Sequence, residues 1–145
     1  PTGLCLRFEF LDLATAYTLD RKQFGKPIGS FQAVKHMLAQ AAIEIEFSKA
    51  TLYRAAYSLD NDNPLQKLHA AQAKLQAIDA CEMASRNSMQ AHGAMGYTWE
   101  MDLHIFIRRG WSYKQVWGNK SLLENYIMNQ LEKDLPKLGS TYTFL

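Results

Sequence analysis

The chain has 145 residues, a length that suits one domain with a hydrophobic core of its own. Its formal net charge is +2 and no basic block is longer than Arg108-Arg109, so we do not expect nucleic acid as a partner. No apolar run approaches the ~20 residues that a membrane-spanning helix needs, and no signal-peptide pattern opens the chain.

The two cysteines, Cys5 and Cys81, lie inside helical patterns, and no second Cys or His stands at metal-ligand spacing from either. We expect small buried side chains in a reducing compartment, with no disulfide and no metal site. The opening Pro1-Thr2-Gly3 has no initiator Met and is typical of an excised or processed piece of a longer protein.

The first predicted helix runs from Leu4 to about Gln23, where apolar residues recur every three or four positions with charged residues between them. Gly25, Pro27 and Gly29 then break the pattern. Ser30 is a favourable N-cap for the second helix, which continues from position 31 to position 59. That length is typical of a helix in a bundle.

Turn-forming residues at positions 60–64 precede the third predicted helix, with Asn63 as its N-cap and Pro64 at its first position. This helix has two apolar stripes that we expect in the core, namely Leu68, Ala71, Leu75 and Ile78, and Ala73, Ala77, Ala80 and Ala84. Glycines at positions 93 and 96 end it. A fourth helix is predicted from Met101 to about Val116, with Gly110 as an interruption.

The last predicted helix begins near Leu122 and ends before Pro136. Ser121 and Glu124 have the spacing of a capping box, in which each side chain bonds to a backbone amide of the other residue. Because no useful β-alternation appears, we predict an all-α domain. It is an up-and-down four-helix bundle with additional short helices over residues 1–135, followed by a tail at 136–145.

Two glycine-interrupted junctions between long helices are the most informative stretches of the sequence. One is Arg21-Lys22-Gln23-Phe24-Gly25-Lys26-Pro27-Ile28-Gly29-Ser30-Phe31-Gln32, and the other is Gln90-Ala91-His92-Gly93-Ala94-Met95-Gly96-Tyr97. Their order and separation resemble those of the C-terminal helical domain of the acyl-CoA dehydrogenase family. The resemblance extends from about Gly3 to Leu131 and implies the same bundle fold.

The resemblance also implies that FAD is the cofactor. In the family, the residues matching Arg21 and Phe24 contact the FAD of a neighbouring subunit, and the stretch matching Gln90 to Ala94 lies along its adenosine end. An arginine offers a fixed cation to a pyrophosphate, whereas without the resemblance a surface arginine and a core phenylalanine would be favoured. For His92 we expect packing or a nucleotide contact. The implied cofactor-binding residues are Arg21, Phe24, Gln32, Gln90, Ala91, His92, Gly93, Ala94, Asn119 and Ser121.

The implied reaction is α,β-dehydrogenation of an acyl-CoA thioester, in which a carboxylate removes the α-proton and the β-hydrogen leaves as hydride to the flavin. Many members carry that carboxylate in a Tyr-Glu-Gly-Thr phrase, where this chain has Val116-Trp117-Gly118-Asn119. Because the indole of Trp117 cannot accept the proton, we assign no catalytic residue. The base then lies upstream of Pro1, comes from a different subunit, or has been lost while nucleotide binding was kept.

We therefore expect the C-terminal domain of a flavin-dependent acyl-CoA dehydrogenase, an oxidoreductase of fatty acid metabolism, that is active only in its full assembly. The isolated chain is expected to be inactive and to bind little or no flavin. The alternatives are a non-catalytic assembly or FAD-binding subunit without its own base, and a helical bundle without a cofactor. The implied partners are an acyl-CoA substrate, a homo- or hetero-tetramer and an electron-transferring flavoprotein, in the bacterial cytoplasm or the mitochondrial matrix.

Overall fold

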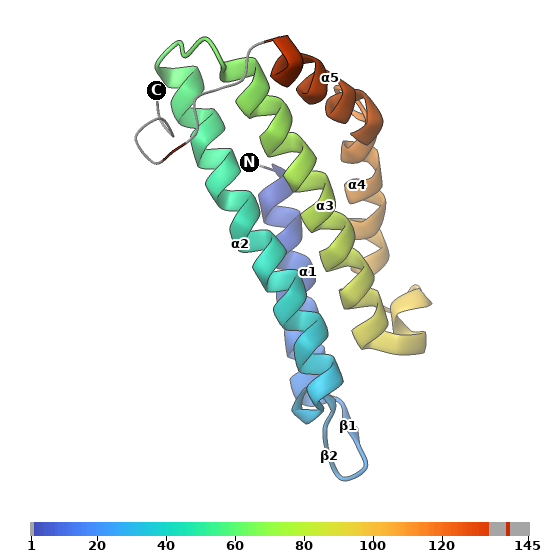
Figure 1. Ribbon diagram of the computed structural model, residues 1–145. Coiled ribbons are helices and arrows are strands. Elements are labelled where there is room, and N and C mark those ends of the chain that lie inside the picture. The colour runs from blue at the N-terminus through green and yellow to red at the C-terminus, as the bar shows by residue number, and fades with distance from the viewer. Residues whose placement is uncertain (1, 134–138, 140–145) are drawn as a thin grey trace.

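Three long helices form most of the domain in the computed structural model, which describes residues 2–133 and 139, with side chains described from Glu9 onward. They are α1 (Thr2–Asp20), α2 (Gln32–Asp60) and α3 (Gln66–His92). The shorter helices α4 (Leu103–Gln115) and α5 (Lys120–Lys133) follow one another along α3 and together form the fourth layer (Figure 1). The predicted all-α bundle is confirmed. The predicted tail falls almost entirely outside the described residues.

Short elements connect the helices at the end of the bundle where α1 stops and α2 starts (Figure 1). Strands β1 (Lys22–Gln23) and β2 (Lys26–Pro27) pair antiparallel, and the 3-10 turn η1 (Ile28–Ser30) follows them. A second 3-10 segment, η2 (Gly93–Tyr97), follows α3. The hairpin was not predicted, because two-residue strands are too short to show the alternation that marks a strand in a sequence.

Helix α1 enters the core through residues that recur every four positions. Phe10, Ala14 and Thr18 are fully buried at a spacing of four residues, whereas Leu19 is 65% exposed. The main core cluster joins four helices and comprises Phe10, Ala41, Ile45, Ala84, Leu103 and Ile107. A second cluster, between α3 and α5, comprises Ala71, Ile78 and Leu123.

Helix α3 is the central element, since it contacts α1, α2, α4 and α5. Its two predicted stripes are in the core or at its margin: Leu68, Ala71, Ala73, Ile78, Ala80 and Ala84 are buried, and Leu75 and Ala77 are partly buried. The small alanine side chains let neighbouring helices approach closely. Cys81, which we predicted to be buried, is only partly so, and the side chain of Cys5 is outside the described set.

Two of the predicted caps for α2 and α3 are wrong in detail. The Ser30 hydroxyl donates to the Pro27 carbonyl at 2.7 Å, inside η1, and Phe31 precedes α2 instead. Asn63 Oδ1 accepts a hydrogen bond from the Leu65 amide at 2.8 Å, but α3 begins only at Gln66. Pro64 therefore lies in a turn before the helix rather than at its first position.

The predicted capping box at the start of α5 is also wrong. The helix begins at Lys120, so Ser121 is already its second residue. Asn119 Oδ1 accepts a hydrogen bond from the Leu122 amide at 3.0 Å and satisfies one of the amides that a helix N-terminus leaves unpaired. Glu124 lies 4.0 Å from Lys120. An asparagine two residues earlier thus takes the role that we assigned to the serine.

Candidate cofactor-binding site

The first junction is a tight hairpin whose turn is formed by Phe24 and Gly25. Phe24 has φ 53° and Gly25 has φ 77°, and a type I′ hairpin turn requires positive φ at both of its central residues. A non-glycine residue in this left-handed conformation costs roughly 1–2 kcal/mol. The backbone conformation of Phe24 in this turn therefore lowers the stability of the folded chain.

Phe24 points into solvent at the tip of the bundle. Its side chain is 91% exposed, and its ring meets Phe31 edge to face with 6.2 Å between centroids. The ammonium of Lys26 lies 4.6 Å from the centre of the Phe31 ring. Arg21 and Lys22 are also exposed at this junction, so the hairpin presents one exposed aromatic ring and three cationic side chains. This combination suits a ligand with an aromatic group and a negative charge.

Close packing between η1 and α1 explains the second glycine of this junction. A Cβ atom on Gly29 would lie 3.1 Å from the Thr18 carbonyl oxygen and 3.3 Å from Oγ1 of the same residue. Thr18 is itself 1% exposed. Gly29 therefore anchors the hairpin against α1 and fixes the start of α2, where the predicted site residue Gln32 is exposed.

The second junction ends α3 with a glycine in a conformation that few other residues adopt. Gly93 has φ 60° and ψ −137°, and a Cβ there would meet nothing within 4 Å. Gly96 folds back on α3, where a Cβ would lie 3.0 Å from the Met89 carbonyl oxygen. Gln90, Gly93 and Ala94 are exposed. The backbone at Gly93 and Ala94 is therefore open to a ligand.

Two predicted residues of this junction point inward instead. Ala91 is 7% exposed and His92 is 3% exposed. The His92 ring stacks on Tyr17 of α1 with 4.4 Å between centroids, and its Nδ1 lies 2.7 Å from the Ser88 carbonyl oxygen, to which it can donate. The packing role that we expected for His92 is therefore the one that its contacts show. A nucleotide contact through either side chain stays a prediction.

The structure brings the first two junctions to the same end of the bundle (Figure 1). The Tyr17–His92 stack joins the end of α1 to the end of α3. Asn87 of α3 donates to the Met37 carbonyl of α2 at 2.8 Å. Residues from three helices thus place the Arg21–Gln32 hairpin and the Gln90–Ala94 turn at the same end of the bundle.

The third predicted set, Asn119 and Ser121, lies elsewhere. The turn that contains Asn119 is bonded to Lys74 of α3, sixteen residues before Gln90. At 1.5 Å per residue that separation is about 24 Å along the helix. Both residues are exposed, but the Asn119 side chain is engaged as the cap of α5. This set cannot contact the same part of a ligand as Gln90.

Two lysines fix the turn between α4 and α5, and sequence reasoning missed both. The Lys74 ammonium donates to the carbonyl oxygens of Val116 and Gly118, the second at 2.7 Å, and burial lowers the pKa of Lys74. The Lys120 ammonium lies 2.6 Å from Asp79 Oδ1, a hydrogen bond that raises the pKa of Lys120. Partners more than forty residues away in the sequence leave no local pattern that could have revealed them.

The turn itself presents Trp117. This residue has φ 57°, and its indole is 89% exposed. Residues 116–118 carry no carboxylate, so the turn offers no group that could remove a proton from carbon.

Comparison with known proteins decides the family. Residues 5–132 match the family model described as "Acyl-CoA dehydrogenase, C-terminal domain". This chain belongs to the acyl-CoA dehydrogenase family. It is similar to the acyl-CoA dehydrogenase IpdE2 of Mycobacterium tuberculosis, with 34% identity over 86% of this chain and 36% of that protein. The glutaryl-CoA dehydrogenase of Desulfococcus multivorans is 35% identical over 86% of this chain and 32% of its own length.

The acyl-CoA dehydrogenase fold is also evident from structure comparison. The chain superposes on butyryl-CoA dehydrogenase from Megasphaera elsdenii with a TM-score of 0.85 and 26% identity, over 90% of this chain and 34% of that one. The chain thus spans about a third of the length of these relatives. It corresponds to the C-terminal helical domain of these acyl-CoA dehydrogenases.

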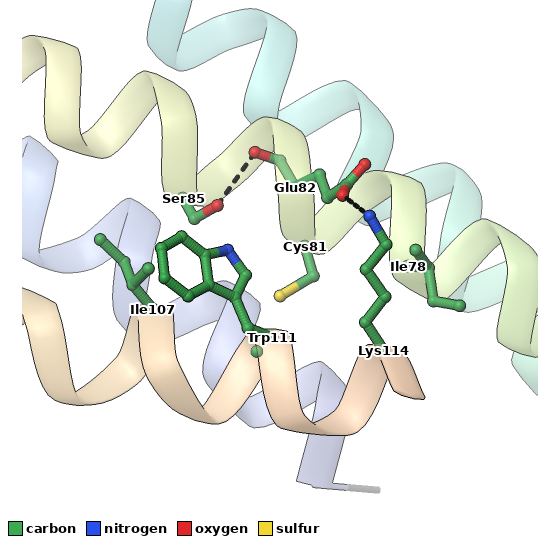
Figure 2. Close-up of a pocket in the computed structure, with 8 residues that line it drawn as sticks. Ile78, Cys81, Glu82, Ser85, Ile107, Trp111 and Lys114 are labelled. Carbon is green, nitrogen blue, oxygen red and sulfur yellow. Dashed lines mark hydrogen bonds and ion pairs between the residues drawn. The ribbon is translucent and has the colours of Figure 1, made fainter. Parts of the chain in front are cut away.

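A small cavity between α3 and α4 of this acyl-CoA dehydrogenase domain has a structural role (Figure 2). Glu82 and Lys114 form an ion pair across it, and the Ser85 hydroxyl donates to the Glu82 carbonyl at 3.0 Å. Its volume is about 10 Å³, the space of roughly one water molecule. A Cβ on Gly110 would lie 2.9 Å from Cys81 Sγ, so Gly110 permits close helix packing here.

Neither a metal site nor a membrane span is present in the part of the chain that the structure describes. No group of three or more His, Cys, Asp or Glu residues among residues 2–133 could hold a metal ion. No described helix is long and apolar enough to cross a membrane.

Proposed function

We propose that this domain holds FAD for a flavin-dependent acyl-CoA dehydrogenase, at the end of the bundle that carries both the hairpin and the end of α3. The observation that carries the proposal is the Phe24 ring, 91% exposed on a left-handed turn among Arg21, Lys22 and Lys26. An exposed aromatic ring in a strained turn contributes little to the stability of the fold, but it offers a large apolar contact surface to a ligand. The exposed aromatic ring and the cationic side chains therefore suit an anionic dinucleotide.

Each predicted residue has a role that follows from its position. Arg21 pairs with the pyrophosphate, and Phe24 packs against a flat part of the nucleotide. The exposed amide side chains of Gln32 and Gln90 offer hydrogen bonds to ribose or adenine. At Gly93 and Ala94 the backbone approaches the ligand, whereas Ala91 and His92 keep the end of α3 in place. Asn119 and Ser121 contact a different part of a nucleotide, or a second one.

The proposed activity belongs to the intact protein. When FAD is bound, it supplies a hydride acceptor for the dehydrogenation of an acyl-CoA thioester. The residues of this domain bind and orient the nucleotide, and they also help to form an oligomer, for which a tetramer is our proposal. A carboxylate that removes the α-proton has to come from outside residues 116–118.

A second candidate function follows from Trp117. The Lys74 hydrogen bonds hold the turn on both sides of this residue, so the indole has a fixed place at the position where many relatives carry their base. This arrangement favours a subunit that binds FAD and supports assembly but depends on a partner for the base. An intact protein that retains FAD, yet does not transfer electrons from any acyl-CoA to it, would support this candidate.

The partners and location that we propose follow those of the family. An electron-transferring flavoprotein is the proposed electron acceptor, and an acyl-CoA thioester is the proposed substrate. The relatives named above are bacterial, so we propose the bacterial cytoplasm, and the mitochondrial matrix has no support among them.

The decisive experiment measures the FAD content of the intact protein and of an Arg21→Ala variant, with Arg109→Ala as the matched control. Both arginines are exposed, but Arg109 is on α4, away from the hairpin. A charge-assisted hydrogen bond contributes ~1.5–3 kcal/mol, so we expect Arg21→Ala to weaken FAD binding about tenfold or more. Equal FAD affinity in the two variants would show that the hairpin does not bind the cofactor.

A further inference from the structure

Lys74 of α3 differs from other bonded lysines of this domain in the chemistry of its partners. Among the described residues, three other lysines lie within salt-bridge distance of a carboxylate, in the pairs Lys49–Glu46, Lys114–Glu82 and Lys120–Asp79. The hydrogen-bond partners of the Lys74 ammonium are instead the carbonyl oxygens of Val116 and Gly118. Neutral acceptors stabilise a positive charge less than a carboxylate does, so the charge of Lys74 is the least compensated of the four.

The two carbonyl groups suit a neutral amine as partners of Lys74. A primary amine that has lost its extra proton keeps two N–H bonds, one for each carbonyl oxygen. Its lone pair takes the remaining tetrahedral position and so points away from both carbonyls. Burial lowers the pKa of Lys74, which increases the fraction of the neutral form. A lysine becomes a nucleophile in this way.

The turn that Lys74 holds lies at the surface of the protein. Lys74 itself is partly exposed, and Trp117, between the two bonded carbonyl groups, is 89% exposed. A reagent in solution therefore reaches the amine without unfolding the bundle.

We infer that Lys74 is a site of covalent N-acylation by acyl-CoA thioesters. The inference rests on the proposed function for the class of reagent, but it needs neither bound FAD nor dehydrogenation. The Lys74 ammonium first gives one proton to water, and the lone pair of Nζ then attacks the carbonyl carbon of the thioester. The carbon–sulfur bond breaks as the amide bond forms. Coenzyme A leaves as a thiolate, which takes up the second proton that the nitrogen loses.

Acylation changes the bonds that Lys74 makes to the turn. The product is a neutral amide with a single N–H, so at most one of the two carbonyl oxygens keeps its hydrogen bond. The Asn119 cap of α5 and the Lys120–Asp79 pair are not affected. The acylated protein therefore has a looser turn at Trp117 but keeps its helices.

Incubation of the intact protein with acetyl-CoA at mildly alkaline pH tests the inference, with peptide mass spectrometry to measure the rate at each lysine. We expect Lys74 to be acetylated several-fold faster than Lys120, because the hydrogen bond to Asp79 raises the pKa of Lys120. Lys74 should also react faster than Lys67, an exposed lysine of the same helix. A rate at Lys74 no higher than at these two lysines would overturn the inference.

A carboxylate placed beside Lys74 tests the physical reason. Ala70 is partly exposed one turn before Lys74 on α3, and a glutamate four residues before a lysine has the favourable orientation for an ion pair. Ala70→Glu should therefore slow acetylation of Lys74 several-fold and leave Lys120 unchanged. Ala70→Gln has the same size without the charge and should react as the wild type does. Equal rates at Lys74 in the two variants would contradict the role of the missing negative partner, and circular dichroism verifies that both are folded.

Hydrogen exchange tests the effect on the turn and keeps the inference separate from the proposed function. In the acetylated protein we expect faster exchange at residues 116–119 and unchanged exchange in α2. Unchanged exchange at residues 116–119 would show that acylation does not release the turn. An intact protein that binds FAD but shows no preference for Lys74 would overturn the inference and leave the proposed function standing. Preferential acetylation in a protein that does not bind FAD would have the opposite meaning.

Discussion

The ammonium of Lys74 lies 2.7 Å from the carbonyl oxygen of Gly118 and also donates to that of Val116, so one side chain of α3 bonds to the backbone on both sides of Trp117. Replacing Lys74 by methionine removes both bonds while keeping much of the side-chain volume. We expect a loss of about 1 kcal/mol in the free energy of unfolding, because the group is only partly buried, together with a shift in tryptophan emission. Lys67→Met, at an exposed lysine of the same helix, should change neither in a urea titration followed by fluorescence.

Gly110 is expected to resist substitution because of Cys81, although it lies within a helix. An alanine Cβ would come within 2.9 Å of Cys81 Sγ, and such overpacking costs about 1–3 kcal/mol, more than the ~1 kcal/mol that alanine gains in helix propensity. Gly110→Ala should therefore destabilise the wild type. In a Cys81→Ala background the sulfur is gone, and the same substitution should stabilise. A double-mutant cycle by thermal unfolding measures this reversal, and equal effects in both backgrounds would disprove the contact.

Stability should fall on mild acidification because of His69. This residue is 2% exposed and lies 2.6 Å from the Ser58 hydroxyl, and burial, with a smaller contribution from Arg54, lowers its pKa below the ordinary 6.5. As pH falls through about 6.5 the unfolded chain takes up a proton that the folded chain does not, so unfolding becomes more favourable. Urea titrations at about pH 8 and about pH 5.5 should show this loss.

The variant His69→Gln tests whether this histidine causes the pH dependence. We expect a smaller difference between the two pH values, whatever the stability of the variant at either one. His36→Gln, at an exposed histidine of α2, should keep the wild-type difference. If the difference in stability between the two pH values is unchanged in His69→Gln, groups other than His69 cause the pH dependence.

Phe24→Gly should separate binding from folding. Glycine adopts the positive φ of this turn without strain, and the Phe24 ring is 91% exposed, so the free energy of unfolding should change by less than about 1 kcal/mol. FAD retention by the intact protein should nevertheless fall several-fold, because the apolar surface is lost. A comparable loss of FAD in Met128→Ala, on α5, would show that the effect is not specific to the hairpin.

The isolated chain should bind little or no flavin. The hairpin and the end of α3 form one edge of the proposed site, where Phe24, Gly93 and Ala94 are exposed to solvent. A visible absorption spectrum of the purified chain should therefore lack a stoichiometric flavin band. A yellow protein with one FAD per chain would show that this domain is sufficient for binding.

Most of the fold was predictable because its signals are local. Glycine breaks at positions 25, 29, 93 and 96 marked the junctions, and the alanine stripes of α3 marked its core faces. The caps were less predictable, since Asn119 rather than Ser121 satisfies the first turn of α5, and both are good capping residues. On α1, packing against the neighbouring helices buries Ala14 and Thr18 and leaves Leu19 exposed, a choice that apolar spacing on one helix does not make.

The candidate site was predictable only in part. The family resemblance supplied Arg21, Phe24 and Gln90, and the structure added the left-handed turn that keeps Phe24 in solvent. It also turned Ala91 and His92 inward and separated Asn119 from the other residues by most of the length of α3. Lys74 and Lys120 had no signal in the sequence that distinguished them from ordinary surface residues.

By itself the sequence determined the helical class, the positions of the junctions and the family, because periodicity, glycine conformation and short ordered phrases are properties of neighbouring residues. Only the tertiary structure decided which junctions lie at the same end of the bundle and how Lys74 holds the turn at Trp117. Those relationships depend on contacts between residues that are far apart in the chain. They arise only when the helices pack, because packing buries one side of each helix and so determines which residues on its other side stay exposed.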